Sequence, residues 1–301
     1  MENKNIDGKT VSQILYQELR KYTETKSKKP TIVDISIGED FGGLVYAKMK
    51  KQTLEREVNF DFINKHFKTI TKDNLIAYIS ELNANSSIDG IMIQLPLPAD
   101  LEKYEREILD TIDCKKDIDG LTTTTLGKLF TNQSCLAPCT PSGIINLLKI
   151  YNVDFIGKNV VIINRSNIVG KPLEQLFLLE NATTTLCHSK TKKLKDITSK
   201  ADILVVAMNK QEYITDEYIA PGAIVVDIGV HKNHDGKIVG DVSYSSVYDK
   251  ISLITPPTGS VGPMTIAMLA YNAAKSLYGE EINDVLERGI EKSKKIIRTG
   301  K

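Results

Sequence analysis

The sequence lacks the features that mark a membrane, secreted or nucleic-acid-binding protein. No apolar run in the 301 residues approaches the roughly 20 residues that span a bilayer, and residues 1–4 do not begin a signal peptide. Lysine and arginine total 39 and aspartate and glutamate total 38, so the net charge of +1 creates no strong field for nucleic acid or an anionic membrane. We therefore expect a cytoplasmic protein with no nucleic-acid and no membrane partner.

The four cysteines lack the spacing of a metal site. Cys135 and Cys139 are four residues apart, but no matching His/Cys pair completes a set of ligands. Cys114 and Cys187 have no cysteine close in sequence, and no C-x-x-C pair occurs. We expect four reduced thiols and no bound metal.

Strands and helices alternate along the sequence, which is long enough for two domains. This alternation predicts parallel sheets with covering helices, so the expected fold class is α/β with two domains. The first is an αβα catalytic domain over residues 1–140, and the second is a Rossmann-type nucleotide domain over 141–262. Residues 263–301 are expected to form helices that pack back on the first domain and complete it.

The expected elements follow from apolar spacing and from turn residues. In the first half, helices are predicted over residues 10–25, 44–56 and 72–83, and strands over 31–37 and 90–94. A helix with Pro141 in its first turn, capped by Thr140 and running to Tyr151, should link the halves. In the second half, strands are predicted over 158–163, 182–187, 202–207, 223–227 and 252–254, and helices over 173–180, from 263 past 271, and over 281–297.

The turn NRSNIVGKP, residues 164–172, is the strongest sign of a nucleotide site. It joins a buried strand to a helix, so backbone N–H groups and the positive helix end meet where a phosphate can bind. Arg165 adds a fixed fork of donors suited to phosphate. The G-x-G-x-x-G pattern is absent, because Gly170 is the only glycine of the turn. The alternative is an ordinary strand-to-helix turn with a surface arginine.

The end of the next strand favours NADP over NAD. An NAD site normally has Asp or Glu there, about 20 residues past the turn, to bind the ribose 2′-hydroxyl. This chain has His188-Ser189-Lys190 instead, with Arg165 close to the same point of the expected fold. A hydroxyl and cations suit a 2′-phosphate, so NADP is the expected cofactor.

Two chemically active residues share one face of the helix expected over residues 44–56. Tyr46 and Lys50 are four apart, which places them one helical turn from each other. A lysine with a phenol neighbour in a partly dry cleft can transfer protons near neutral pH. The alternative is a surface lysine, like its neighbours Lys48 and Lys51.

Gln94 and Asp119 are further candidates. Gln94 stands at the carboxyl end of its expected strand, where open α/β sheets bind ligands, and the prolines after it stop the strand. Asp119 lies between an apolar residue and a glycine, and Asp117 is a candidate for capping the same turn. Singly, each residue is more typical of a turn or a cap. Their occurrence together with Tyr46 and Lys50 favours a site.

These residues stand in segments that resemble the bifunctional methylenetetrahydrofolate dehydrogenase/methenyltetrahydrofolate cyclohydrolase family. The resemblance covers nearly the whole length and keeps the order of the motifs. The matching segments are VYAKMK (45–50), DGIMIQLPLP (89–98), KDIDGLT (116–122), PCTPSG (138–143), RSNIVGKP (165–172), TLCHSKT (185–191), PGAIVVDIG (221–229), VGDV (239–242) and VGPMT (261–265).

The resemblance implies two reactions of tetrahydrofolate derivatives at one site. NADP-dependent oxidation converts 5,10-methylenetetrahydrofolate to the methenyl cation, and hydrolysis of that cation yields 10-formyltetrahydrofolate. Lys50 would be the main catalytic residue of the hydrolysis, with Gln94 holding and tuning it. Tyr46 would stack on the folate, and Asp119 would accept hydrogen bonds from the pterin. Neither step requires a metal.

The resemblance also implies the ligand contacts and a homodimer formed through the nucleotide domain. The loop over residues 255–263 would close over pterin and nicotinamide. The implied folate-binding residues are Tyr46, Gln94, Leu95, Pro96, Asp119, Pro257, Gly259, Gly262 and Pro263. The implied NADP-binding residues are Asn164, Arg165, Ser166, Ile168, Val169, Ser189, Asn209, Ile228, Val230, Gly262 and Thr265.

Several positions depart from the family pattern, mainly around the expected cofactor. Asn164 and Asn209 stand in place of glycines, and asparagine tolerates left-handed backbone angles better than most residues. The other departures are Thr125 for Asn, Thr258 for Pro, Ser260 for Gly, and Phe-Gly-Gly at 41–43 for Pro-Ala-Ser. These changes bear on nucleotide preference and dehydrogenation more than on hydrolysis.

Three other classes share part of this pattern. Short-chain dehydrogenases also use Tyr-x-x-x-Lys, but their dinucleotide turn precedes that pair, whereas here it follows. Shikimate- or amino-acid-dehydrogenase-like enzymes share the two-domain plan but do not explain residues 89–98 or 261–265. A folate- or nucleotide-binding regulatory protein without turnover would not need a proton-handling lysine.

Overall fold

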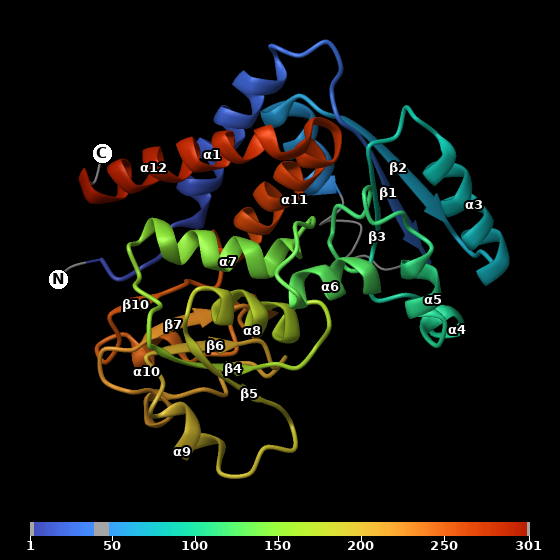
Figure 1. The fold of residues 1–301 in the computed structure, drawn as a ribbon. Helices are drawn as coiled ribbons and strands as arrows, with labels where there is room; N and C mark the ends of the chain where they lie inside the picture. The colour runs from blue at the N-terminus through green and yellow to red at the C-terminus, as the bar shows by residue number, and fades with distance from the viewer. Residues whose placement is uncertain (1–2, 39–47, 300–301) are drawn as a thin grey trace. The chain divides into compact units, whose positions relative to one another are not determined.

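The computed structural model describes residues 3–38 and 48–299, which form two compact units (Figure 1). The three-stranded unit comprises Gln13–Cys139 and Ile266–Lys292. The five-stranded unit comprises Met1–Ser12, Thr140–Thr265 and Ser293–Lys301.

The three-stranded unit contains a parallel sheet in the order β2-β1-β3. Its strands are β1 (Thr31–Ile37), β2 (Asp61–Phe67) and β3 (Gly90–Ile93). The helical elements that lie wholly within this unit are residues 48–53, the π-helix η1 (Leu54–Val58), α3 (Lys72–Ala84), α4 (Ala99–Glu102), α5 (Glu105–Asp110), α6 (Thr123–Phe130) and the 3-10 helix η3 (Gly279–Ile282).

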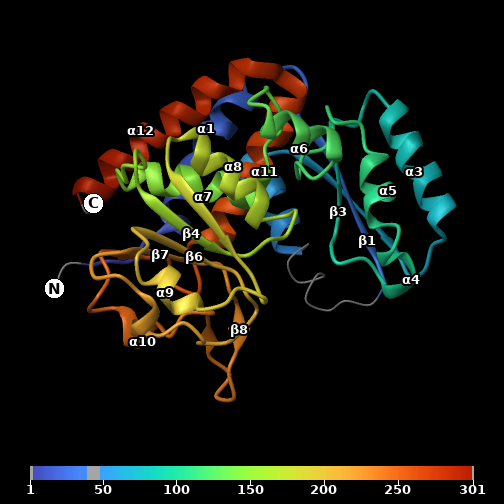
Figure 2. The ribbon, with the colours of Figure 1, turned by 60° about the horizontal axis from the view of Figure 1, so that its bottom comes forward.

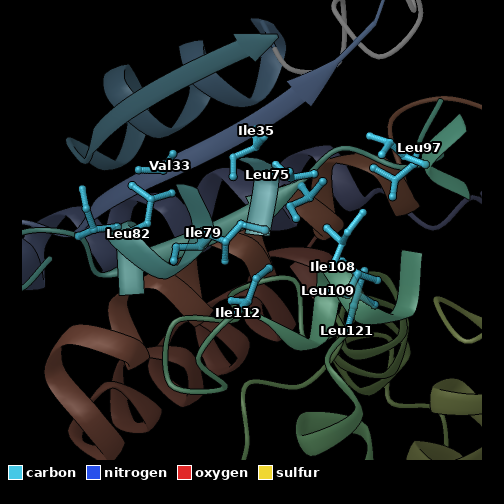
Figure 3. Packing of buried hydrophobic residues seen from close by; sticks show 14 residues of the cluster. Val33, Ile35, Leu75, Ile79, Leu82, Leu97, Ile108, Leu109, Ile112 and Leu121 are labelled. Atoms are coloured by element: carbon cyan, nitrogen blue, oxygen red, sulfur yellow. The ribbon is translucent and has the colours of Figure 1, made fainter. Parts of the chain in front are cut away.

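One face of this sheet packs on α3 and α5 in an apolar core (Figure 3). Thr71 is the N-cap of α3, and its side chain accepts the N–H of Asn74 at 3.3 Å, which satisfies one free donor of the first turn. Leu75 and Ile79 lie one turn apart and pack with Val33 and Ile35 of β1. Each fully buried Leu or Ile stabilises the fold by about 1.5–3 kcal/mol relative to an exposed one.

Strand β2 was not predicted from the sequence. It forms an edge of the sheet, and Phe62 is the only one of its residues that is buried. The other side chains of DFINKHF face solvent or are half-buried, so the apolar run of a covered strand is missing. The pairing with β1 therefore depends on backbone hydrogen bonds more than on an apolar pattern.

The five-stranded unit contains a parallel sheet in the order β10-β7-β6-β4-β5. Its strands are β4 (Asn159–Ile163), β5 (Thr183–Cys187), β6 (Ile203–Val206), β7 (Ile224–Asp227) and β10 (Leu253–Ile254). All five coincide with predicted strands to within a residue or so. An antiparallel pair, β8 (His231–Lys232) and β9 (Ile238–Val239), projects from this unit (Figure 2). Its shorter helices are α8 (Gly170–Leu179), α9 (Leu194–Thr198), η2 (Asp216–Tyr218) and α10 (Tyr244–Val247).

Among the described residues, four helices contain residues of both units. These are α1 (Gly8–Thr23), α7 (Cys139–Ile150), α11 (Val261–Tyr278) and α12 (Asn283–Thr299). Within the three-stranded unit, Asn272 of α11 donates to the carbonyl of Ile118 at 2.8 Å, and Ser276 donates to that of Asp89 at 2.5 Å. The expectation that the C-terminal helices return to the first domain is confirmed for Ile266–Lys292, whereas residues 263–265 and 293–299 belong to the five-stranded unit.

Several predicted helix starts differ from those of the structure by two or three residues. Helix α7 begins at Cys139, so Thr140 is a helical residue and not a cap, and its hydroxyl hydrogen-bonds that of Thr265 at 3.0 Å. Helix α8 begins at Gly170, three residues before the predicted start. Among the helices of residues 3–38 and 48–299, none has the length and hydropathy required to cross a bilayer.

Candidate functional site

Lys50 is a buried lysine on the short helix of residues 48–53. Its side chain is 4% exposed, and its Nζ lies 3.9 Å from the Sδ of Met92 on β3. Lys48, on the same helix, is exposed. The alternative of a surface lysine is therefore wrong for Lys50. Tyr46, its predicted partner, lies outside the described residues.

Gln94 follows β3, as predicted, but its partner is a residue that the sequence analysis missed. Its Nε2 donates to both carboxylate oxygens of Asp34, at 2.7 and 2.9 Å. Burial raises the pKa of Asp34, and the charge of Lys50 and the hydrogen bond from Gln94 oppose that rise. The signal for Asp34 was an acid in the middle of the largely apolar strand TIVDISI.

Asp117 and Asp119 have different roles, although they are two residues apart. Asp117 is buried and accepts the backbone N–H groups of Gly120, Leu121 and Thr122 at 2.8–3.1 Å. Its role as a turn-capping residue is thus confirmed. The hydroxyl of Thr125 also donates to it at 2.8 Å, which gives this departure from the family pattern a local structural purpose.

Asp119 is a half-buried carboxyl with its own electrostatic surroundings. Loss of solvation raises its pKa to about 6. The charge of Lys50 opposes this rise, whereas Asp117 and Asp34 add to it. Asp34, Lys50 and Asp119 are therefore electrostatically linked within the three-stranded unit. Leu95 and Pro96, also predicted to bind folate, follow Gln94 directly and are joined by a cis peptide bond.

A pocket of about 280 Å³ lies at the carboxyl ends of β4, β5 and β6. Strand β4 has β5 on one side and β6 on the other, so the chain changes direction across the sheet at this point. Open α/β sheets bind nucleotides at such a switch point. The lining residues are Ile163, Asn164, Arg165, His188, Ser189, Thr191, Leu194, Ala207, Met208, Lys210 and Tyr213.

The chemistry of this pocket fits an anionic ligand. Arg165 and Lys210 supply positive charge, Ser189 supplies a hydroxyl, and no Asp or Glu occurs among the described residues that line it. Of the residues predicted to bind NADP, Asn164, Arg165 and Ser189 line the pocket, and their role in binding stays a prediction. Lys210 and Tyr213 were not predicted to lie there. Their position shortly after the strand predicted over residues 202–207 could have indicated it.

The side chain of Asn164 links the ends of β4 and β6 beside this pocket through hydrogen bonds. Its Nδ2 donates to the carbonyl of Ala207 at 2.7 Å. Its Oδ1 accepts the N–H groups of Ser166 at 2.8 Å and Gly170 at 3.0 Å. A Cβ at Gly170 would lie 2.2 Å from the carbonyl oxygen of Asn164, so only glycine allows this close approach of helix and strand.

The remaining residues predicted to bind NADP lie around the same unit without lining this pocket. Asn209 has a φ of 56°, the left-handed conformation that asparagine tolerates, and its N–H contacts the buried Asp241. The hydroxyl of Ser166 accepts the N–H of Val169 at 3.0 Å, within the turn. Ile168 and Val230 are exposed, Ile228 follows β7, and Gly262 and Thr265 lie in the first turns of α11.

The residues of the expected closing loop belong to the five-stranded unit. Pro257 and Gly259 lie between β10 and α11, and Pro263 is in the first turn of α11. Gly259 has a φ of 79°, which favours glycine, and its carbonyl accepts the N–H of Lys9 at 2.8 Å. A role in folate binding stays a prediction.

The cysteines and acidic residues give no sign of a metal centre. All four cysteines are in the described part of the chain, and no disulfide joins them. Within residues 3–38 and 48–299, no group of three or more His, Cys, Asp or Glu residues has the arrangement of a metal site.

Comparison with protein families decides what these two units are. Residues 6–119 match the model of the tetrahydrofolate dehydrogenase/cyclohydrolase catalytic domain. Residues 138–280 match the NAD(P)-binding domain of the same enzymes. The chain belongs to the tetrahydrofolate dehydrogenase/cyclohydrolase family. The short-chain and shikimate dehydrogenase alternatives are therefore wrong.

Members of this family resemble the chain over most of its length. The bifunctional protein FolD of Clostridium perfringens strain 13 is 44% identical over 279 residues, which cover 91% of this chain and 99% of the relative. The crystal structure of the bifunctional FolD dehydrogenase/cyclohydrolase of Campylobacter jejuni has a TM-score of 0.87 and 39% identity, covering 90% of this chain and 97% of that one. The Trypanosoma brucei FolD structure, complexed with NADP and an inhibitor, has a TM-score of 0.83 and 28% identity, covering 95% and 98%.

Proposed function

We propose that the chain is a bifunctional enzyme of one-carbon metabolism. It oxidises 5,10-methylenetetrahydrofolate with NADP and hydrolyses the 5,10-methenyl product to 10-formyltetrahydrofolate. The observation that carries this proposal is the burial of Lys50 against Met92, near enough to Asp34 and Asp119 for their charges to interact, in a chain of this family. A protein that only binds its ligand has no need to bury an ammonium group, because the burial of charge is costly.

The five-stranded unit supplies the nucleotide site. NADP, when bound, supplies the acceptor for the hydride that leaves the methylene carbon. Arg165 presents a planar set of donors that suits a phosphate, and the Ser189 hydroxyl lines the same pocket. The absence of an acidic side chain among the described lining residues removes the usual partner of an unphosphorylated ribose. These features support NADP as the preferred nucleotide.

The three-stranded unit supplies the folate site. The methenyl carbon is already electrophilic, so the protein mainly has to position water and handle its proton. Lys50 performs this role, because its amine can accept the proton that the water loses, and the charges of Asp34 and Asp119 stabilise the ammonium that results. Asp119 holds the pterin through hydrogen bonds that its carboxylate accepts. Tyr46, Leu95 and Pro96 contact the folate beside them.

We also propose that the enzyme works in the cytoplasm as a homodimer, as the family resemblance implies. Size-exclusion chromatography with light scattering measures the mass of the particle in solution. A mass near twice the 33.5 kDa of one chain is expected. A mass near 33.5 kDa at micromolar concentrations would contradict the dimer.

The proposal is tested by the absorbance of the methenyl form. Growth of this band after addition of methylenetetrahydrofolate and NADP is expected, with a slower rate when NAD replaces NADP. Decay of added methenyltetrahydrofolate should exceed the spontaneous rate in the same buffer. The absence of both changes would favour a folate- or nucleotide-binding protein without turnover.

A further inference from the structure

Asp34 is a buried carboxylate in the middle of β1, TIVDISI, where four of the other six residues are isoleucine or valine. Its side chain is 0% exposed, and its neighbours Val33 and Ile35 pack in the core of Figure 3. A strand covered on both faces normally carries apolar side chains throughout. A buried acid is costly unless it is hydrogen-bonded, so its partner explains its presence.

The register of the sheet brings Asp34 to Gln94. Asp34 pairs with Met92 of the neighbouring β3, and Gln94 stands two residues beyond Met92. Side chains two residues apart point to the same face of a strand, so Asp34, Met92 and Gln94 share one face. The same face carries the contact from Lys50 to Met92.

The hydrogen bonds of Asp34 determine which end of the Gln94 amide faces the site. A carboxylate only accepts hydrogen bonds, and both of its oxygens are within reach of the Gln94 Nε2, at 2.7 and 2.9 Å. The amide nitrogen must therefore face Asp34, and the carbonyl oxygen must point away from it. Gln94 then presents an acceptor, and not a donor, to its other neighbours.

We propose that Asp34 is a positioning residue of the hydrolytic reaction, and that it acts by holding the Gln94 amide in one orientation beside Lys50. This inference rests on the proposed cyclohydrolase function. With the acceptor end turned outward, Gln94 can receive a hydrogen bond from the Lys50 ammonium or from the attacking water. With the amide reversed, its NH₂ group would oppose that ammonium.

The two reactions make unequal demands on this arrangement. In hydrolysis, the oxygen of water forms a bond to the methenyl carbon and loses a proton to the Lys50 amine, and a C–N bond then breaks with its electron pair remaining on nitrogen. Proton transfer in both steps depends on the position of Lys50 and its neighbours. In the oxidation, the lone pair of a folate nitrogen drives the hydride onto NADP without a strong base. Disorder of the Gln94 amide should therefore slow hydrolysis more than oxidation.

The first test compares two variants by the ratio of cyclohydrolase to dehydrogenase kcat. Asp34→Val removes both acceptors and suits a strand, and the ratio should fall by about tenfold to a hundredfold. Asp34→Asn retains one acceptor but also offers a donor, so a smaller fall in the ratio is expected.

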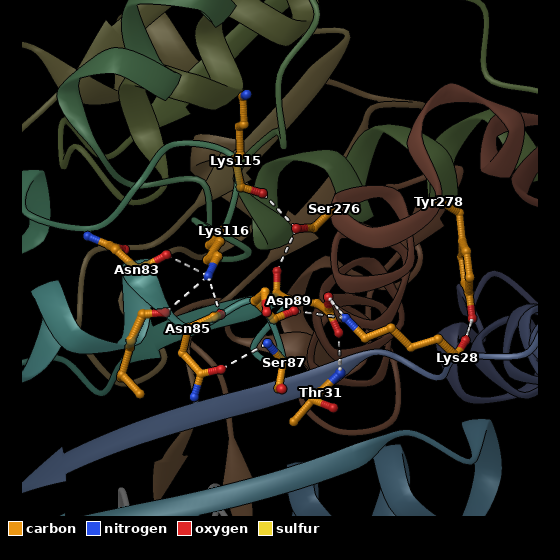
Figure 4. A network of polar contacts seen from close by, with 12 residues as sticks. Lys28, Thr31, Asn83, Asn85, Ser87, Asp89, Lys115, Lys116, Ser276 and Tyr278 are labelled. Carbon is orange, nitrogen blue, oxygen red and sulfur yellow. Dashed lines mark hydrogen bonds and ion pairs between the residues drawn. The ribbon is translucent and has the colours of Figure 1, made fainter.

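Asp89→Asn is the matched control. Asp89 is a 7% exposed aspartate of the same unit, bound by Lys28 at 2.5 Å and by the N–H of Thr31 at 2.9 Å (Figure 4). It stands at the start of β3, and Gln94 stands at the other end. Loss of this buried charge should lower stability without changing the ratio of the two activities.

The second test asks whether Asp34 acts through Gln94. In a Gln94→Ala background, the further change Asp34→Val should leave the ratio within about twofold of the Gln94→Ala value, because two residues that act as one unit are not additive. Multiplicative effects of the two changes would overturn the proposal. So would a wild-type ratio in folded Asp34→Val, or an equal fall of both activities.

If the valine variant does not fold, the test uses Asp34→Asn alone. A wild-type ratio of the two activities in Asp34→Asn would then overturn the proposal. Failure of the underlying function has a different signature. A wild-type chain that oxidises methylenetetrahydrofolate but does not hydrolyse the methenyl form would refute the cyclohydrolase itself, whatever the variants do.

Discussion

The backbone N–H of Asp241 donates to the Oδ1 of Asp227 at 3.2 Å, so two buried aspartates lie in direct contact in the five-stranded unit. Burial raises the pKa of Asp227 to about 6, against the effect of three backbone N–H groups that donate to it, and the charge of Asp241 adds to the rise. A Cβ at Gly240 would lie 1.8 Å from the Asp227 carboxylate, which explains the glycine there. The segments 221–229 and 239–242 thus have a structural role.

Asp241 connects this pair to the nucleotide pocket. Its carboxylate accepts the N–H groups of Met208, Asn209 and Lys210 at 2.6–3.2 Å. It also hydrogen-bonds the His231 ring at 2.8 Å. Met208 and Lys210 line the pocket, so the buried Asp241 holds the backbone of lining residues in place.

Asp241→Ala should weaken both the fold and NADP binding. Three backbone donors lose their acceptor, so the free energy of unfolding should fall by about 3 kcal/mol. The KM for NADP should rise by about tenfold or more as the loop over residues 208–210 loses its fixed shape. Chemical denaturation and steady-state kinetics measure the two effects. Asp202→Ala, which removes an exposed acceptor of the single N–H of Asn159, is the control. An unchanged KM for NADP in Asp241→Ala would contradict this account.

Arg165→Met should reduce selectivity for NADP over NAD. The loss of a phosphate-binding fork should lower kcat/KM for NADP by about tenfold to a hundredfold, with little change for NAD. Both values come from initial rates with each nucleotide. Lys171→Met serves as control, because Lys171 contacts Asn167 at 2.7 Å and does not line the pocket. Equal losses with both nucleotides would assign Arg165 to the pyrophosphate instead.

Lys50→Met should separate the two reactions. Removal of the proton-handling group should lower the cyclohydrolase rate by about a hundredfold or more, whereas oxidation, which needs no strong base, should persist in part. Methionine suits the position because Met92 is already in contact there. The exposed Lys48→Met on the same helix is the matched control. Equal loss of both rates, with folate binding intact, would disprove the assigned role of Lys50.

Asp119→Asn should stabilise the protein while it weakens folate binding. The folded pKa of Asp119 is raised to about 6, so the folded protein binds a proton more tightly than the unfolded chain does. The stability contribution of this proton is present at low pH and is lost as pH rises to about 6. At pH 7.5 the variant should be more stable than the wild type by about 1–3 kcal/mol, after allowance for partial solvent exposure.

The two readouts for Asp119 are denaturation and the KM for folate at several pH values. For the wild type, the KM should rise as pH falls through about 6, because the protonated carboxyl no longer accepts two pterin hydrogen bonds. The asparagine variant should have a high KM with no such inflection. A wild-type KM that is constant between pH 5 and 8 would count against an ionised Asp119 in folate binding.

Much of the fold could be predicted, because the apolar runs of the sequence match the side chains that a parallel sheet covered by helices requires. The strands over residues 159–163 and 224–227 are β-branched runs without polar alternation, which suits a parallel sheet with helices on both faces. Strand β2 escaped prediction because its sequence, DFINKHF, has a single buried residue and no such run. The helix starts near Thr140 and Gly170 were misplaced by one to three residues, since several residues in each turn can begin a helix.

By itself the sequence determined the family, most of the strands along the chain, and the identity of the lysine and arginine that the chemistry needs. These depend on residue type and local spacing. Only the tertiary structure decided which side chains are partners. Asp34 accepts hydrogen bonds from Gln94, 60 positions away, because the strand register brings the two together. Asp241 accepts the N–H groups of residues 208–210, about 30 positions away, because the loops close on each other. No local pattern records such contacts, since they depend on how separate elements align in space.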